Sequence, residues 1–473
     1  MGFFGGLSAE AYDRQYTDAQ LLRRMVNYFA PHRGAIALMS ATLLVTAVLD
    51  TVPSLVIAYG ISALEGGEPV VTLLLIAGGL LLNNVIYWMT NYVRRRTTTR
   101  LIGDVIRELR ETAFQAAIGH DLSFYDRIST GRIVSRITFD TQEFANVTVL
   151  VADTLSQLLA VGILSVALFR ADVGLTLMLW AATIPVFFVA GAFRRLARHA
   201  MQQSQRAQAT VNATIQETIS GIAVAKNFRQ ESAIYTDFRA TNELAYRGQL
   251  TRVAVFGSIY PLLNTISGLG EAAIVYAGGL LVIGKSITVG DWYLFVQSLT
   301  IFFYPITSIA SFWSQFQQGL AASERVFALI DDEPQVVQTA SEPVGRLRGA
   351  IGFEDVSFNY STGRNAVLRD FSLAIPAGET LAIVGHTGAG KSSLVKLLMR
   401  FYEFQSGRIL LDGRDIRALD MGEYRRQIGL VPQAPFLFSG SVADNIRYGR
   451  AGASDEEVAA AARRLGDGSW LDD

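Results

Sequence analysis

The chain of 473 residues is long enough for two or three domains. Half of its residues are hydrophobic and only 18% are charged, and its mean hydropathy is +0.29 although long stretches are polar. We therefore expect a strongly apolar part joined to a soluble part. The net charge of −1 gives no reason to expect a nucleic-acid partner. The lack of cysteine excludes disulfides, thiolate zinc sites and a cysteine nucleophile.

The N-terminal region, residues 1–33, does not read as a signal peptide. It lacks a basic start followed by an apolar core, and it contains acidic residues. Within it, residues 21–29 mix apolar side chains with the pair Arg23-Arg24 at helical spacing. This pattern predicts a short helix at a membrane surface, with a solvated lead-in as the alternative.

Six apolar stretches are long enough to cross a bilayer, which takes about 20 helical residues. They come in pairs joined by tight turns, and this regularity argues against buried helices of a soluble protein. The predicted spans are 34–60, 70–92, 146–169, 173–193, 254–283 and 291–316. We assign residues 34–330 to a six-helix transmembrane domain.

The distribution of basic residues predicts the orientation of these spans. Each tight turn holds one basic residue at most, whereas the 94–136 segment holds nine Arg and the 194–252 segment holds eight Arg and one Lys. The positive-inside rule places both long segments and both termini in the cytoplasm. The protein is thus predicted to be a multi-pass protein of the cell (plasma or inner) membrane.

Both long segments also have helical patterns, so the membrane helices are expected to continue far into the cytoplasm. Each segment is expected to turn once, near 121–126 and near 212–221. Two such helical hairpins could contact a cytoplasmic partner domain and link it mechanically to the spans.

The composition changes after Ile330. A polar linker covers 331–349, and residues 350–473 form a soluble domain. Alternating patterns predict strands at 351–360 and 371–375, and the short apolar run 380–384 predicts a fully buried strand. Further on, 406–413 is typical of a strand ending in an Asp-Gly turn. A capping box at 454–457 opens a predicted helix that stops at Gly466.

A glycine-rich loop follows the run 380–384 and leads directly into a helix, which is the context that a phosphate-binding loop requires. Its glycines let backbone N–H groups surround a phosphate, and the helix N-terminus adds attraction. Lys391 is expected to reach the β- and γ-phosphates of ATP, and the Ser392 hydroxyl to ligate Mg²⁺. The loop is Gly385-His386-Thr387-Gly388-Ala389-Gly390-Lys391-Ser392.

With these features together, the chain resembles an ATP-binding cassette (ABC) exporter of the half-transporter type, similar to multidrug and lipid exporters. The resemblance implies an all-α six-helix transmembrane domain with long cytoplasmic helical extensions, followed by an incomplete α/β P-loop ATP-binding domain. Segments near 120–132 and 210–222 resemble the two coupling segments of that family, and 431–440 resembles its glutamine loop, continued by Asp444-Asn445-Ile446.

The resemblance also assigns roles to single residues. Tyr360 matches the aromatic residue that stacks on adenine, and Gln433 matches the residue that reaches Mg²⁺ and the attacking water. Ser392 and Gln433 are thus the expected metal ligands. The complete expected ATP-binding set is Tyr360, Gly385, His386, Thr387, Gly388, Ala389, Gly390, Lys391, Ser392, Ser393 and Gln433.

The chain departs from the family pattern after the glutamine loop. It contains no Leu-Ser-Gly-Gly-Gln signature, no apolar strand ending in Asp-Glu, and no histidine after the phosphate loop. No catalytic residue can therefore be identified in it, although ATP hydrolysis needs groups that position water and neutralise the γ-phosphate. We expect a sequence that stops early, either as a fragment or as a natural truncation.

Two functions remain open from the sequence. The first is one subunit of a dimeric exporter that uses ATP to move a small or amphipathic molecule, with an identical or a different second subunit. The alternative is a membrane partner that binds ATP without hydrolysing it, or a non-functional fragment. A soluble ATPase acting on DNA is excluded by the spans.

Polar residues inside the spans are candidates for a substrate cavity, because ionisable groups are costly there. Such a cavity could favour amphipathic or cationic compounds, whereas contacts with neighbouring helices are the alternative. The candidates are Asp50, Asp153 and Glu271, with Asn83, Asn84, Trp88, Gln157, Tyr260 and Asn264.

Overall fold

The computed structural model describes residues 16–361 and 366–465, except for a few helical residues whose side chains are left out of the description. Contacts within the chain define two units. The helical unit comprises residues 1–114 and 135–330, and the α/β unit comprises residues 115–134 and 331–473. The chain crosses from one unit to the other three times.

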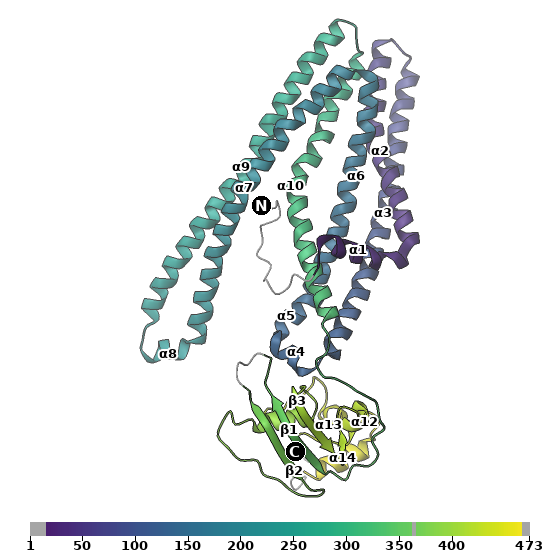
Figure 1. Ribbon diagram of the computed structural model, residues 1–473. Helices are drawn as coiled ribbons and strands as arrows, with labels where there is room; N and C mark the ends of the chain where they lie inside the picture. The colour runs from purple at the N-terminus through teal and green to yellow at the C-terminus, as the bar shows by residue number, and fades with distance from the viewer. Residues whose placement is uncertain (1–15, 362–365, 466–473) are drawn as a thin grey trace. The chain divides into compact units, whose positions relative to one another are not determined.

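Long helices joined by short turns make up the helical unit (Figure 1). Helix α3 has 50 residues and is therefore about 75 Å long, more than twice the thickness of a bilayer's hydrocarbon core. This confirms that the helices continue beyond the predicted spans. The elements are α1 (Asp18–Phe29), η1 (Ala30–His32), α2 (Arg33–Glu65), α3 (Val70–Gly119), η2 (Arg136–Asp140), α6 (Thr141–Ala171), α7 (Val173–Ser220), α8 (Ile222–Asn227), α9 (Glu231–Ile283) and α10 (Val289–Asp331).

In the part of the chain that the structure describes, five helical segments are long and apolar enough to cross a membrane. They contain the first five predicted spans, which identifies a multi-pass membrane protein. The sixth predicted span, 291–316, falls in α10, where several side chains lie outside the described residues. Its membrane crossing stays a prediction.

Helix α1 confirms the helix predicted at 21–29. A capping box between Thr17 and Gln20 starts it, and its apolar side buries Leu21 and Met25. The Tyr28 ring stacks on Phe327 of α10 with centroids 5.8 Å apart. The helix is therefore packed against α10 through its apolar side, and its predicted position at a membrane surface stays a prediction.

The core of the helical unit lies between α6, α7, α9 and α10, where Leu164, Leu179, Ile274 and Phe295 are fully buried. Close helix crossings use small residues. An ideal Cβ atom on Gly290 would lie 2.0 Å from the carbonyl oxygen of Ala58, so only glycine lets α10 approach α2 this closely.

An ion pair joins η2, which leads into α6, to α10. Asp140 ends the π-helical turn η2, and its side chain is only 10% exposed. Arg325 of α10 donates from Nε and Nη2 to the two carboxylate oxygens of Asp140, at 2.9 and 2.6 Å. This paired geometry fixes α10 against the start of α6.

The second turn lies further along the chain than the predicted 212–221. Helix α7 continues to Ser220, because residues 212–220 contain no glycine or proline that would end it. The turn then contains α8 and Arg229, which has a positive φ of 51°, before α9 begins at Glu231. It therefore occupies residues 221–230.

The α/β unit contains a four-stranded antiparallel sheet in the order β2-β1-β3-β4. Phe353, Phe358, Ile409 and Tyr424 are buried in its core. The elements are α4 (Leu122–Arg127), α5 (Thr130–Ser135), β1 (Ile351–Phe358), β2 (Leu368–Ile375), α11 (Lys391–Leu398), β3 (Ser406–Leu411), β4 (Arg414–Asp415), α12 (Met421–Arg426), α13 (Val442–Arg447) and α14 (Asp455–Arg463).

Most predicted elements of this unit are confirmed. Strand β1 covers residues 351–358 of the predicted 351–360, and β2 covers the predicted 371–375. An Asp-Gly turn with positive φ at both residues joins β3 to β4. A capping box between Ser454 and Glu457 opens α14 as predicted. The predicted stop at Gly466 lies outside the described residues.

The strand predicted at 380–384 is not formed. These residues have no regular structure, and Val384 is 89% exposed. A strand needs a neighbour for its N–H and C=O groups. Among the described residues, the sheet pairs only β1 to β4 and offers no partner to this segment. The prediction of a fully buried strand is therefore wrong for this structure.

The predicted linker at 331–349 is an ordered segment of the α/β unit. Its backbone N–H groups at Thr339 and Glu342 donate to the carbonyl oxygens of Arg417 and Ala418, at 3.0 and 2.8 Å. Arg400 is 2% exposed and donates to the side chain of Gln338 at 2.6 Å. Burial lowers the pKa of Arg400. These contacts hold the linker along the unit.

Candidate functional site

The glycine-rich loop lies directly before α11. Gly388 and Gly390 have φ angles of +88° and +85°, in the left-handed region that glycine adopts readily. An ideal Cβ atom on Gly390 would also lie 3.2 Å from side-chain atoms of Val367 and Leu368. The backbone conformation therefore favours glycine where the loop turns into the helix, and a side chain there would also crowd Val367 and Leu368.

Lys391 folds back over the loop that precedes it. Its Nζ donates to the carbonyl oxygens of Gly385 and His386, both at 2.8 Å, and Ala389 N–H donates to His386 at 3.2 Å. The ammonium group is therefore held above the loop. The N–H groups at the start of an α-helix such as α11 have no acceptor within the helix. The ammonium group of Lys391 and these backbone donors therefore lie at the same end of α11.

The two serines that follow Lys391 have different surroundings. The Ser392 side chain is exposed, whereas Ser393 is 6% exposed. The hydroxyl groups of Ser393 and Tyr360 are hydrogen-bonded at 2.8 Å. The structure thus brings Tyr360 to the first turn of α11, and Ser393 contacts Tyr360.

A cavity of about 360 Å³ adjoins the loop. It lies against β2 and is lined by Leu368, Phe371, Ile383, Lys391 and Leu394, among others. Tyr360 is not part of its lining. Its lining combines apolar side chains with two cationic ones, Lys391 and Arg369, which suits a ligand with an apolar part and a negative charge.

The segment around Gln433 is irregular and exposed. Among the described residues, no hydrogen bond joins Gln433 to the phosphate loop. Asn445 fixes the end of this segment, because its side chain accepts from Phe438 N–H at 2.8 Å and donates to Phe438 C=O at 3.0 Å. The hydrogen bonds of Asn445 therefore connect residues 444–446 to the end of the segment that contains Gln433.

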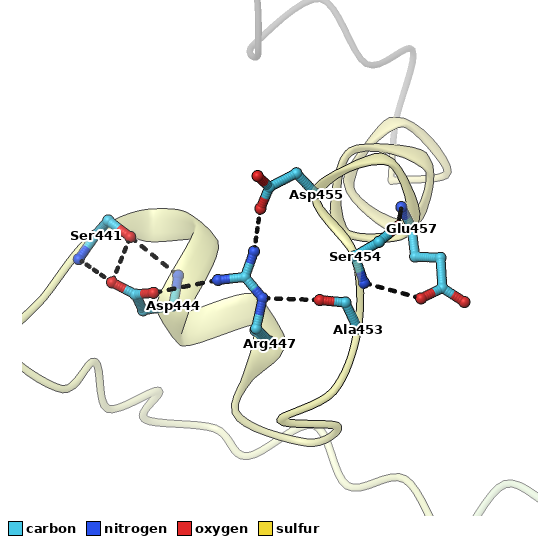
Figure 2. Close-up of polar contacts among 7 residues, drawn as sticks. All are labelled: Ser441, Asp444, Arg447, Ala453, Ser454, Asp455 and Glu457. Atoms are coloured by element: carbon cyan, nitrogen blue, oxygen red, sulfur yellow. Dashed lines mark hydrogen bonds and ion pairs between the residues drawn. The ribbon is translucent and has the colours of Figure 1, made fainter.

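Figure 2 shows how α13 and α14 are held together. Ser441 and Asp444 form a capping box at the start of α13. Arg447 lies at the end of α13 and donates to Asp444 at 3.3 Å, to Ala453 C=O at 3.0 Å, and to Asp455. One guanidinium group thus connects both helices.

Comparisons with known proteins show the family of the chain. Residues 36–306 match the family described as ABC transporter transmembrane region, and residues 368–473 match the family described as ABC transporter. The chain belongs to the ABC transporter family.

Three relatives show how far the similarity extends. An uncharacterized ABC transporter ATP-binding protein of Bacillus subtilis (strain 168) is 32% identical over 98% of this chain and 78% of its own length. A fatty acid ABC transporter ATP-binding/permease protein of Mycobacterium bovis is 36% identical over 72% of this chain and 54% of its own length. An ATP-dependent lipid A-core flippase of Syntrophus aciditrophicus is 32% identical over 76% of this chain and 60% of its own length.

In this ABC transporter, the first loop between long helices is part of the α/β unit. Asp121 caps α4 by accepting from Ser123 N–H at 2.9 Å, and its other oxygen accepts from Gln335 and Val336 N–H at 2.5 and 3.0 Å. Partial burial opposes ionisation of Asp121, but the hydrogen bonds from Ser123 and from the two linker N–H groups outweigh it and lower its pKa. A single carboxylate therefore joins α4 to the linker.

Further contacts join α4 to the segment that follows α11. The N–H group of Leu122 donates to Phe401 C=O at 3.2 Å, and the Tyr402 hydroxyl donates to the Asp126 carboxylate at 2.7 Å. Arg127 also pairs with Asp332 at 2.9 Å. Tyr402 was not identified from the sequence, because its partner lies 276 positions away and no spacing pattern relates the two.

Several polar residues of this ABC transporter's spans have partners on the helices, whereas the buried side-chain oxygen of Gln157 has no hydrogen-bond partner among the described residues. Asp153 pairs with Arg94 at 3.2 Å, Asp50 is hydrogen-bonded to Tyr87, and Asn83 donates to Leu49 C=O at 3.3 Å. These contacts support the alternative in which such residues face other helices. Three other candidates do not distinguish a substrate cavity from contacts with neighbouring helices. Asn84 donates to Leu80 C=O and Trp88 stacks on Tyr92, both within α3, and Glu271 is exposed. The Tyr260 side chain lies outside the described residues.

Proposed function

We propose that the chain is one subunit of a dimeric ABC transporter that uses ATP to export a small or amphipathic molecule. The observation that carries this proposal is the glycine-rich loop, which holds Lys391 over two carbonyl groups directly before α11 in a chain that also contains the transmembrane region of the family. Both the fatty acid transporter and the lipid A-core flippase are relatives with amphipathic substrates in their names, which supports such a substrate here.

The residues of the loop fit ATP with Mg²⁺. Gly388 and Gly390 leave room for a phosphate to approach the backbone, and Lys391 can exchange its carbonyl contacts for phosphate oxygens. The exposed Ser392 hydroxyl is available to a metal ion. Bound Mg²⁺ would neutralise charge on the phosphates. We retain Gln433 as a second metal ligand and Tyr360 as the adenine contact within this proposal.

The orientation belongs to the same proposal. We place six spans in the cell membrane with both termini in the cytoplasm, because basic residues gather in the 94–136 and 194–252 segments. The long helical extensions then lie on the side where ATP is available, and the loop 120–132 acts as a coupling segment.

Export can be tested with the protein in its native membrane, together with the subunit with which it assembles. Inside-out vesicles would be supplied with a panel of dyes, lipids, peptides and siderophores, with and without ATP. We expect ATP-dependent uptake of at least one compound, and we expect Lys391→Ala to abolish it. Uptake that Lys391→Ala leaves unchanged would contradict the proposal.

A subunit that binds ATP without hydrolysing it is the second candidate. It is favoured by the contacts of Lys391, which are to carbonyl groups only, while none of the described carboxylates is bonded to the loop. Phosphate release in the native membrane, measured together with the subunit with which the chain assembles, separates the candidates. The export proposal predicts release that Lys391→Ala abolishes, and the second candidate predicts ATP binding without release. From the purified 473-residue chain alone we expect binding without release under both candidates, because no catalytic carboxylate has been identified in it.

A further inference from the structure

The cavity beside the glycine-rich loop has apolar walls from β2, α11 and the segment before the loop. Leu368 of β2 and Leu394 of α11 form its inner wall and are each 6% exposed. Ile383 and Val384 form the outer wall and are 42% and 89% exposed. Because these two apolar side chains border the cavity and remain in contact with water, a ligand with an apolar part would be favoured by covering them.

Two cationic side chains line the same cavity, and neither pairs with a carboxylate of the described residues. The ammonium group of Lys391 donates to two carbonyl oxygens of the loop. Arg369 is exposed on β2, and its neighbour Asp370 is hydrogen-bonded to Ser357 instead. A guanidinium group can bind a carboxylate through two parallel hydrogen bonds. The cavity thus offers an anion two positive charges that no described acidic side chain compensates.

The cavity differs from the place where we expect adenine. Tyr360, the proposed adenine contact, is absent from its lining, and the Tyr360 hydroxyl is bonded to Ser393 at 2.8 Å. The volume of about 360 Å³ holds on the order of ten non-hydrogen atoms, since a water molecule occupies about 30 Å³. Its size and apolar walls suit an alkyl chain of about eight carbons better than a polar nucleotide.

We propose that this cavity binds a medium-chain carboxylate, with the alkyl chain against Leu368, Ile383 and Leu394 and the carboxylate on Arg369 and Lys391. The carboxylate then uses the ammonium group that the proposed function assigns to ATP, so the two ligands compete. This competition rests on the proposed function, whereas the carboxylate site itself does not. An amphipathic anion that reaches the α/β unit would thereby lower the occupancy of ATP.

Photolabelling of the full chain in lipid nanodiscs tests the site. The probe is octanoate with a diazirine in its alkyl chain, and its methyl ester is the uncharged control. Mass spectrometry of the labelled peptides separates the cavity from the spans, which both probes reach through the lipid. We expect the acid to label residues 380–394 about fivefold more than the ester, because only the acid gains hydrogen bonds between charged groups. Equal labelling of 380–394 by acid and ester would overturn the proposal.

Substitutions of the lining test the placement of the carboxylate and of the alkyl chain. Arg369→Gln should lower labelling of 380–394 about tenfold, because the guanidinium group is lost from an exposed position. Ile383→Asp should lower it as well, because it places a negative charge in the apolar wall. Arg408→Gln is the matched control: Arg408 is exposed on β3 of the same sheet and pairs with Glu354 at 2.8 Å. It should be labelled like wild type, and full labelling of Arg369→Gln and Ile383→Asp would overturn the site.

Mg·ATP separates this inference from the proposed function. Saturating Mg·ATP should lower labelling of 380–394 by the acid, and octanoate should in turn weaken Mg·ATP binding, because the effect of one ligand on the other is reciprocal. Mg·ATP that binds without changing the labelling would overturn the shared use of Lys391. A chain that is labelled at 380–394 but does not bind Mg·ATP would overturn the proposed function and support the carboxylate site on its own.

Discussion

At the scale of single residues, one carboxylate holds the linker to the first loop. Asp121 accepts hydrogen bonds from Ser123 in α4 and from Gln335 and Val336 in the linker. Each donor favours the ionised form, which is why the pKa of Asp121 is lowered although burial opposes its charge. Its contribution to stability must therefore depend on pH.

The sign of that dependence follows from the lowered pKa. A carboxylate whose folded pKa is depressed stabilises the folded state above its unfolded pKa of about 3.9, and this stabilisation is lost as the pH falls through the folded pKa. At pH 7 we expect Asp121→Asn to speed amide exchange of residues 333–338 about tenfold, since hydrogen bonds to a charged group are lost. Well below pH 3.9, variant and wild type should exchange at nearly the same rate after correction for intrinsic rates.

Asp412→Asn serves as the control for this measurement. Asp412 also accepts from two backbone N–H groups, those of Arg348 and Ala350, at 2.7 and 2.9 Å in the same unit. Its substitution should leave exchange at 333–338 unchanged. A tenfold difference for Asp121→Asn that persisted at low pH would show that the charge of Asp121 is not responsible.

The glycine-rich loop is a local pattern that the sequence shows directly, whereas the residues that connect the loop to the rest of the unit could not be predicted. Gly390 and Lys391 belong to a local pattern in which spacing alone carries the chemistry. The partner of Tyr402 is Asp126, and Arg400 is buried against the linker. Contacts over such sequence distances depend on the tertiary fold, and a single sequence has no signal for them.

At the scale of elements, helices were predicted more reliably than strands. The apolar runs and their charged flanks are local signals, so five spans and the helix at 21–29 are found where expected. The run 380–384 has the composition of a strand but no described neighbour to pair with. Whether a segment forms a strand depends on pairing with residues distant in sequence, and the composition of the segment alone does not show whether such a partner exists.

The natural absence of cysteine allows a direct test of the orientation of these helices. Glu68 lies exposed in the turn between α2 and α3, and Gln230 lies exposed before α9. A membrane-impermeant maleimide added to intact cells should label Glu68→Cys. It should label Gln230→Cys only after the membrane is permeabilised. The reverse pattern, or equal labelling of both, would refute the proposed topology.

At the scale of the whole molecule, the chain joins a multi-pass helical unit to a unit with a phosphate loop. The first loop, residues 120–132, follows α3 in the chain and is part of the α/β unit. Helix α3 runs without a break from residues assigned to the helical unit into residues assigned to the α/β unit.

Equilibrium binding of Mg·ATP to the purified chain tests the central claim most directly. Wild type should bind, and Lys391→Ala should weaken binding about tenfold to a hundredfold, as expected when hydrogen bonds from one ammonium group to phosphate are lost. Arg408→Ala is the charge-matched control, because Arg408 forms only an exposed ion pair with Glu354, and it should bind like wild type. Equal affinity of wild type and Lys391→Ala, or no binding by wild type at millimolar ATP, would contradict the account.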